Sequence, residues 1–261
     1  MPREWNATEY HRLSSPQTVW GARVLERLRL GGHERVIDAG CGTGRLTAML
    51  LERLPEGRVL CLDRSFNMLR VARETLEPRF GRRVGFVHAD LTAVPLREWA
   101  DVAFSTATFH WVLDHARLFS ELFEALRPGG RLVAQCGAAG NLAGLHARAA
   151  RLTESAAYRE LFDEWVDPWE FADADTTRVR LEAAGFEEVV TSVEEAPTKF
   201  DGPREFADFV TTVVLRPFLE RIPRDDARRR FVERLTDEAA DDSPPFLLDY
   251  RRLNLQARKP A

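Results

Sequence analysis

The sequence predicts an α/β fold in which an open, mostly parallel sheet carries helices on both faces. Residues 35–44 have the pattern of a buried strand, a glycine-rich loop and the start of a helix. A second strand is expected over residues 58–62 and leads into Asp63, so strands and helices alternate as they do around a parallel sheet. Ligands of such sheets bind beyond the carboxyl ends of the strands, where the loop and Asp63 both fall.

The loop has glycine at alternate positions, namely Gly40, Gly42 and Gly44. Glycine lets the backbone turn sharply and lets a ligand approach the main chain, while the helix start offers unpaired N–H groups. Arg45 stands one place after the third glycine, so the pattern is G-x-G-x-G rather than the dinucleotide pattern G-x-G-x-x-G. This spacing favours a small ligand without a pyrophosphate.

Apolar periodicity and turn residues place the other elements. We expect helices over residues 16–29, 66–76, 114–126 and 176–184, the first capped by Ser14 or Ser15. We expect five further strands, over residues 83–88, 101–105, 131–136, 187–193 and 247–257, which makes a seven-stranded sheet. Residues 198–244 are expected to form two or three helices interrupted by Pro217 and Pro223.

The length of 261 residues suits one α/β domain with insertions rather than two large domains. We expect a single domain over residues 1–261. Its parts are an N-terminal cap segment (1–30), a ligand-binding core (31–137), two cap insertions (138–172 and 198–244), and closing core segments (173–197 and 245–261).

Composition excludes several classes of function. The net charge of -4 argues against a nucleic-acid surface, and acidic residues flank both basic clusters, residues 79–83 and 228–230, which favours solvated surface. The three cysteines lack metal-ligand spacing and are expected to be reduced core residues. With no leader pattern and no apolar run near ~20 residues, we expect a soluble, cytoplasmic protein without a membrane partner.

Four motifs in order resemble those of class I S-adenosyl-L-methionine (SAM)-dependent methyltransferases. They are Val36 to Gly44, then Leu62-Asp63-Arg64-Ser65-Phe66-Asn67-Met68-Leu69, then Val87-His88-Ala89-Asp90-Leu91, and Leu126-Arg127-Pro128-Gly129-Gly130-Arg131-Leu132-Val133. The resemblance implies a Rossmann-like class I methyltransferase fold with a helical cap, SAM as the cofactor and no metal.

The resemblance also implies a set of SAM-binding residues. These are Asp38, Gly40, Gly42, Gly44, Asp63, Arg64, Met68, Asp90, Leu91 and Thr106. Asp63 is expected to accept the ribose hydroxyls, Met68 to pack on the adenine, and Asp90 and the Leu91 backbone to bind the adenine edge. The alternatives are that Met68 is a core residue and that Asp90 caps a turn.

Further features resemble the subgroup that esterifies carboxylic acids, such as trans-aconitate and juvenile hormone acid methyltransferases. They are Trp5-Asn6-Ala7-x-x-Tyr10, Ser-Ser-x-Gln17, Phe109-His110-Trp111, Phe218-Leu219 and Tyr250-Arg251-Arg252-Leu253. The resemblance places Gln17 and Trp111 as N–H donors to a carboxylate acceptor and brings Tyr10 near the ligand. His110, where trans-aconitate enzymes tend to carry Gln, is either a base or a packed residue.

The sequence therefore predicts a SAM-dependent methyltransferase of a small organic molecule, with a carboxylic acid as the expected acceptor. A carboxylate is already anionic at neutral pH and needs no base, so donors suffice. The alternatives are an acid carried on an acyl carrier protein, a hydroxyl or carbon acceptor, and a SAM-binding module without transfer activity. The oligomeric state is left open.

Overall fold

The computed structural model describes residues 15–261, and the side chains from residue 19 onward. Its main sheet has seven strands in the order β3-β2-β1-β4-β5-β9-β6. These strands are β1 (Arg35–Ala39), β2 (Arg58–Asp63), β3 (Val84–His88), β4 (Ala100–Thr106), β5 (Leu126–Gly137), β6 (Glu187–Glu195) and β9 (Arg251–Arg258). The pairs from β3 to β5 are parallel, whereas β9 is antiparallel to β5. This arrangement confirms the predicted Rossmann-like methyltransferase fold.

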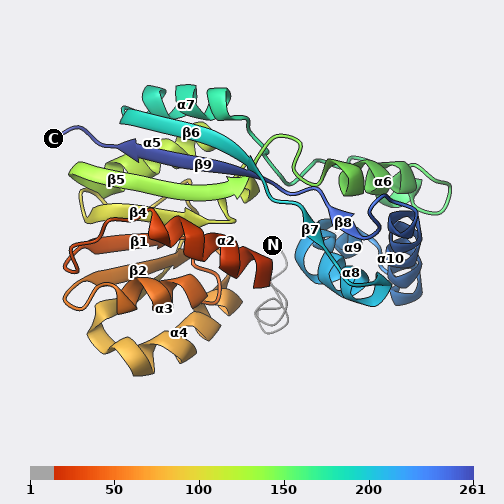
Figure 1. Cartoon of the computed structure of the whole chain (residues 1–261), viewed down its shortest axis with the longest axis horizontal. Helices are drawn as coiled ribbons and strands as arrows, with labels where there is room; N and C mark the ends of the chain where they lie inside the picture. Colours follow the sequence, from red (N-terminus) through yellow and green to blue (C-terminus); the bar gives the residue numbers. More distant parts are fainter. Residues whose placement is uncertain (1–14) are drawn as a thin grey trace. The chain divides into compact units, whose positions relative to one another are not determined.

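Helices cover both faces of this sheet (Figure 1). One face packs against α2 (Ser15–Glu26), α3 (Arg45–Glu52) and α4 (Phe66–Phe80), and the other against α5 (His115–Ala125) and α7 (Ala174–Ala183). Successive strand residues point to opposite faces, so Val36 joins the core under α2 to α4 while Ile37 joins the core under α5 and α7. Both faces are therefore apolar, as buried parallel strands require.

The chain divides into two compact units. Unit 1 contains the sheet and consists of residues up to 139, 169–194 and 252–261. Unit 2, residues 140–168 and 195–251, contains α6 (Ala143–Thr153), α8 (Pro203–Phe209), α9 (Arg216–Arg221), α10 (Asp225–Ala240) and a two-stranded sheet of β7 (Thr198–Lys199) and β8 (Leu247–Leu248). The predicted insertions overlap unit 2, while their role as a cap stays a prediction.

Several element boundaries differ from the sequence-based prediction, and three of the differences have a clear physical reason. The strand expected over residues 247–257 is two strands, because Leu247 and Leu248 pair with β7 and the main sheet is joined only from Arg251. Pro217 lies in the first turn of α9, where no N–H is needed, so it starts a helix rather than interrupting one. β5 begins at Leu126, so the Pro-Gly-Gly segment belongs to this strand. Its pairing with β4 shifts in register between Ala100 and Val102.

No helix in residues 15–261 combines the length and apolar character needed to cross a membrane.

Candidate active site

The glycine loop between β1 and α3 is fixed by its neighbours at the carboxyl edge of the sheet. The amides of Gly40 and Cys41 both donate to the Leu62 carbonyl, at 2.8 and 3.0 Å. Gly40 has φ +79, and a Cβ there would lie 2.2 Å from the Thr108 side chain. Only glycine therefore lets the loop pack against the segment that follows β4.

Gly42 lies at the tip of the loop and faces open space. Its φ is +54, and a Cβ built on it would meet no atom of the described residues within 4 Å. A ligand can therefore approach the main chain closely at this glycine.

Asp63, at the end of β2, is oriented by two backbone amides. Its Oδ2 accepts from the Gly42 N–H at 2.9 Å and its Oδ1 from the Ser65 N–H at 2.8 Å. Ser65 in turn caps α4, accepting from the amide of Met68, which is buried. A carboxylate oxygen can accept more than one hydrogen bond, so a carboxylate held in this orientation is chemically suited to a vicinal diol.

Asp38, at the end of β1, lies in a different environment. The Thr47 hydroxyl donates to its Oδ2 at 2.6 Å, and the residue is 3% exposed. Its pKa is raised to about 7, mainly by burial and in part by the charge of Asp63, against the lowering effect of the Thr47 hydrogen bond. A cation bound beside the two carboxylates would be favourable.

Asp90 follows β3 and caps a turn, one of the two roles that the sequence left open. Its Oδ1 accepts from both the amide and the hydroxyl of Thr92, at 2.9 and 2.8 Å. Both bonds use one oxygen, so Oδ2 remains an acceptor for a ligand. Leu91 beside it is buried, and the carbonyl of Arg64 is held at 2.9 Å from His88 Nε2.

The segment after β4 turns sharply over the glycine loop. Thr106 ends β4, and the Thr108 hydroxyl contacts the carbonyls of Thr106 and Gly40 at 2.9 and 3.2 Å. A short 3-10 helix, Phe109–Trp111, follows. The cofactor loop and the predicted acceptor segment are therefore neighbours.

His110 has a defined hydrogen-bonding state. Its Nδ1 lies 3.2 Å from the Gly137 amide and accepts that N–H, so in the neutral ring the proton is on Nε2. The ring stacks on Phe171 with a centroid distance of 5.6 Å and an interplanar angle of 18°. Trp111 packs on Trp169, at 5.5 Å between centroids. Phe171 and Trp169, which the sequence analysis did not single out, thus pack against this turn.

A partly buried polar network holds this aromatic turn. His115 Nε2 lies 3.0 Å from the Phe109 carbonyl, and Arg180 donates from Nη1 to His115 Nδ1 at 3.2 Å and to Glu170 Oε1 at 2.8 Å. The Glu170 amide donates to the His110 carbonyl at 2.9 Å. Burial lowers the pKa of His115, which favours the neutral ring that this network needs.

The other predicted contacts lie outside the described residues. Trp5 and Tyr10 precede residue 15, and the Gln17 side chain is not described although its backbone belongs to α2. Within residues 15–261, no three His, Cys, Asp or Glu side chains come together as metal ligands.

Comparisons with known proteins agree with this geometry. A family model described as a methyltransferase domain matches residues 37–134. The chain is 30% identical to a trans-aconitate 2-methyltransferase of Methylobacterium nodulans over 98% of both chains. It is 29% identical to one from Paracidovorax citrulli, covering 96% of this chain and 94% of the relative.

Solved structures show the same fold. A phosphoethanolamine N-methyltransferase of Haemonchus contortus has a TM-score of 0.63 at 18% identity, covering 98% of this chain and 57% of that one. A putative methyltransferase of Bacillus halodurans has a TM-score of 0.62, also at 18% identity, covering 92% and 99%. The fold and the glycine loop together define a class I methyltransferase. The chain belongs to the SAM-dependent methyltransferases, and the relatives that it matches over nearly the full length include trans-aconitate 2-methyltransferases.

SAM is the methyl donor of this family, and the residues present fit it. A ligand could approach the main chain at Gly42, the carboxylate of Asp63 could accept hydrogen bonds from a ribose, and a cationic ligand would favour ionisation of the Asp38 carboxyl group. When bound, SAM supplies an electrophilic methyl group on a sulfonium.

Proposed function

We propose that this enzyme methylates a carboxylate of a small organic acid. The observation that carries the proposal is the hydrogen bond from the Gly137 amide to His110 Nδ1. It makes Nε2 a donor in the neutral ring, and a base at Nε2 would need an unprotonated nitrogen there. Because a carboxylate has a pKa near ~4 and is already a nucleophile, the acceptor that suits a donor-only site is an acid.

The similarity to trans-aconitate 2-methyltransferases over nearly the whole chain supports the same class of acceptor. Trp111 and His110 would direct N–H groups at the carboxylate oxygens, and Gln17 would add an amide donor. Their task is to hold one oxygen in line with the methyl group and to exclude water, because in-line displacement depends mainly on alignment.

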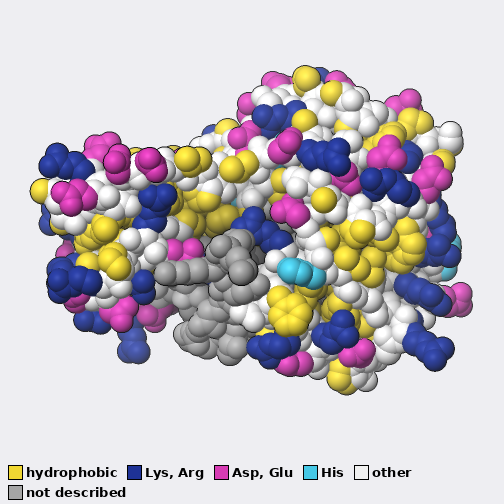
Figure 2. Space-filling model, turned by 180° about the vertical axis from the view of Figure 1, so that it is seen from behind, with side chains coloured by type: hydrophobic (Ala, Val, Ile, Leu, Met, Phe, Trp, Pro, Cys, Tyr) yellow, Lys and Arg dark blue, Asp and Glu magenta, His cyan; other side chains and the backbone are white. Residues whose placement is uncertain are grey.

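A hydroxyl or carbon acceptor would need a base, for which His110 is the candidate, and the observed bond to Gly137 disfavours that role. The relatives give no support for an acyl-carrier-protein partner. Three arginines of the two basic clusters form ion pairs within the chain: Arg79 with Glu52, Arg228 with Asp225, and Arg230 with Asp226. Figure 2 shows basic and acidic side chains interspersed over the face that it draws.

The test uses SAM labelled in its methyl group and a panel of small acids, including trans-aconitate, alongside matched alcohols and amines. A methyl ester releases labelled methanol in mild alkali, whereas an ether, an amine or a C-methyl product does not. We expect an alkali-labile product from an acid. An alkali-stable product as the main result would overturn the proposal.

Variants on the identified acceptor test the roles. Removing a donor, as in Trp111→Ala or Gln17→Ala, should lower kcat/KM by a factor that corresponds to ~1 to 3 kcal/mol of lost transition-state stabilisation. The affinity for SAM should stay nearly unchanged. His110→Ala should have a milder effect than Trp111→Ala. If His110→Ala abolishes turnover while the other two variants remain active, a base is required and carboxyl methylation is the wrong reaction.

A further inference from the structure

Glu121 is a buried carboxylate on the apolar face of α5. It is 3% exposed, and its neighbours along that face, Leu118, Leu122 and Ala125, are fully buried core residues. A buried charge without partners is costly, so a carboxylate at this position requires specific contacts.

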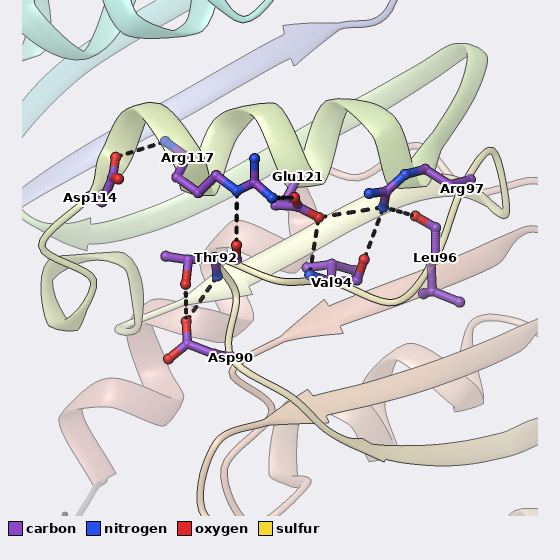
Figure 3. A network of polar contacts seen from close by, with 8 residues as sticks. All are labelled: Asp90, Thr92, Val94, Leu96, Arg97, Asp114, Arg117 and Glu121. Carbon is purple, nitrogen blue, oxygen red and sulfur yellow. Dashed lines mark hydrogen bonds and ion pairs between the residues drawn. The ribbon is translucent and has the colours of Figure 1, made fainter.

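Both oxygens of Glu121 act as acceptors (Figure 3). Oε1 lies 2.6 Å from Arg117 Nη2. Oε2 accepts from the Val94 amide at 3.1 Å and contacts Arg97 Nη1 at 3.4 Å. Glu121 therefore joins α5 to the segment that follows β3.

The two arginines extend these contacts along the same segment. Arg117 donates from Nε to the Thr92 carbonyl at 3.1 Å. Arg97 donates from Nη1 to the carbonyls of Val94 and Leu96, at 3.0 and 2.7 Å. Both arginine side chains are 56% exposed, so their Coulombic contribution to stability is small. What the contacts fix is the path of the backbone from Thr92 to Leu96.

That backbone path continues directly into Asp90. Asp90 Oδ1 accepts from the amide and the hydroxyl of Thr92, whose carbonyl Arg117 holds. A continuous series of hydrogen bonds thus runs from Glu121 through Arg117 and Thr92 to Asp90, as Figure 3 shows. Leu91, between them, is buried.

The start of the same helix lies close to the acceptor turn in sequence. Asp114 caps α5 by accepting from the Arg117 amide at 2.8 Å, three residues after Trp111. Arg117 is therefore held at its backbone by the helix cap and at its guanidinium by Glu121.

We propose that Glu121 is a positioning residue for cofactor binding, which acts through Arg117 and Thr92 to hold Asp90 and Leu91 where they bind the adenine edge. The inference rests on the proposed assignment of Asp90 and Leu91 to the adenine. It is independent of the acceptor, because binding of the product S-adenosylhomocysteine requires no acid.

The substitution Glu121→Gln tests this role with little change in volume. Glutamine offers one oxygen acceptor and one NH2 donor, so it can satisfy either Arg117 or the Val94 amide but not both. We expect S-adenosylhomocysteine to bind roughly fivefold to thirtyfold more weakly by calorimetry. In turnover, KM for SAM should rise while kcat at saturating SAM stays within about twofold.

Glu124→Gln is the matched control, because Glu124 is an exposed glutamate on the same helix. It should leave both the binding constant and the melting temperature unchanged. A Glu121→Gln protein that melts at a lower temperature but binds S-adenosylhomocysteine like the wild type has lost only stability, and the positioning role is then wrong. If Glu121→Gln does not fold, Arg117→Gln keeps the Val94 contact and provides the same comparison.

Asp90→Ala tests the adenine assignment separately from the role of Glu121. We expect this variant to weaken S-adenosylhomocysteine binding, and Glu121→Gln to add little when combined with it, because both act on one contact. Unchanged binding in Asp90→Ala would show that the adenine assignment is wrong. Fully additive losses would show that Glu121 acts by another route, which overturns the positioning inference alone.

Discussion

Two carboxylates at neighbouring strand ends are prepared for different tasks by their surroundings. Asp63 accepts hydrogen bonds from two backbone amides, which fix the orientation of its carboxylate. Asp38 has a single hydroxyl donor and is buried, so its pKa rises to about 7. Both residues are visible in the sequence as acids after strands, but the difference between them depends on Thr47 and on burial, which only the structure supplies.

Replacing Asp63 with alanine should weaken SAM binding roughly tenfold to a hundredfold, because the contact of a carboxylate with ribose hydroxyls is worth ~1.5 to 3 kcal/mol. Calorimetric titration with S-adenosylhomocysteine measures the loss. Asp63→Asn, which keeps one oxygen acceptor, should lie between the alanine variant and the wild type. Binding of the alanine variant within about twofold of the wild type would refute the ribose assignment.

Asp38 should make cofactor binding depend on pH. Its folded pKa of about 7 lies above its ordinary value of 3.8, so the stability it contributes is fully present below 3.8 and is lost as the pH rises through about 7. In the folded protein without ligand, Asp38 therefore favours the protonated acid, whereas a bound cation favours the ionised carboxylate. We therefore expect S-adenosylhomocysteine, which carries an ammonium group, to bind more tightly as the pH rises toward 7.

The measurement is proton release on binding, obtained by calorimetry in two buffers with different ionisation enthalpies. Release should be measurable near pH 6 and should decline above pH 7, since Asp38 is then already ionised (about 7). Asp38→Asn should abolish the release. Persistence of the same release in the asparagine variant would assign it to another group.

At the scale of elements, two glycines of the loop are expected to be needed for different reasons, Gly40 for packing and Gly42 for ligand binding. Gly40→Ala places a Cβ 2.2 Å from Thr108, whereas Gly42→Ala places one in open space, and both positions have positive φ. We expect Gly40→Ala to cost the protein more stability than the ~1 to 2 kcal/mol that positive φ alone imposes. Gly42→Ala should lower the stability by about that strain alone. The variant should nevertheless lose most of its affinity for S-adenosylhomocysteine, because its Cβ occupies the space in which the ligand would approach the main chain.

Thermal unfolding and calorimetric binding of both variants test this contrast. Relief of the Gly40→Ala defect by a second substitution, Thr108→Ser, which removes one of the clashing atoms, would confirm its steric cause. Tight binding by Gly42→Ala would show that the ligand does not lie against the loop tip.

Elements encoded by local chemistry were predictable, and those set by distant partners were not. The strand, loop and helix around Gly40 to Gly44 follow from glycine positions and apolar spacing. The split of the last predicted strand depends on Leu248 pairing with Thr198, some fifty residues earlier in the chain, which periodicity does not reveal. Glu121 could have been noticed in the sequence, because it is an acidic residue among the regularly spaced apolar residues Leu118 and Leu122 of the buried helix face. By contrast, nothing in the local sequence marks Arg180 as a partner of His115.

At the scale of the whole molecule, the proposed cofactor residues from Asp38 to Thr106 all belong to unit 1, while unit 2 has an aromatic core of its own. In unit 2, Phe218 is 4% exposed and stacks on Trp165 at 4.9 Å, with Phe162 and Phe231 both at 6.1 Å. The chain passes from unit 1 into unit 2 and back twice. Each unit is therefore built from chain segments that are separated in sequence by segments of the other unit.

Phe218→Ala should therefore separate stability from cofactor affinity. Removing a buried phenylalanine costs ~3 to 5 kcal/mol, which should lower the first unfolding transition strongly in a thermal scan. Well below that transition, S-adenosylhomocysteine should bind within about twofold of wild type, because its proposed contacts lie in unit 1. Val166→Ala, at a position of unit 2 that is 72% exposed, is the control and should change neither quantity. A large loss of affinity in the folded Phe218→Ala protein would mean that unit 2 contributes to the cofactor site, and the assignment of that site to unit 1 alone would have to be abandoned.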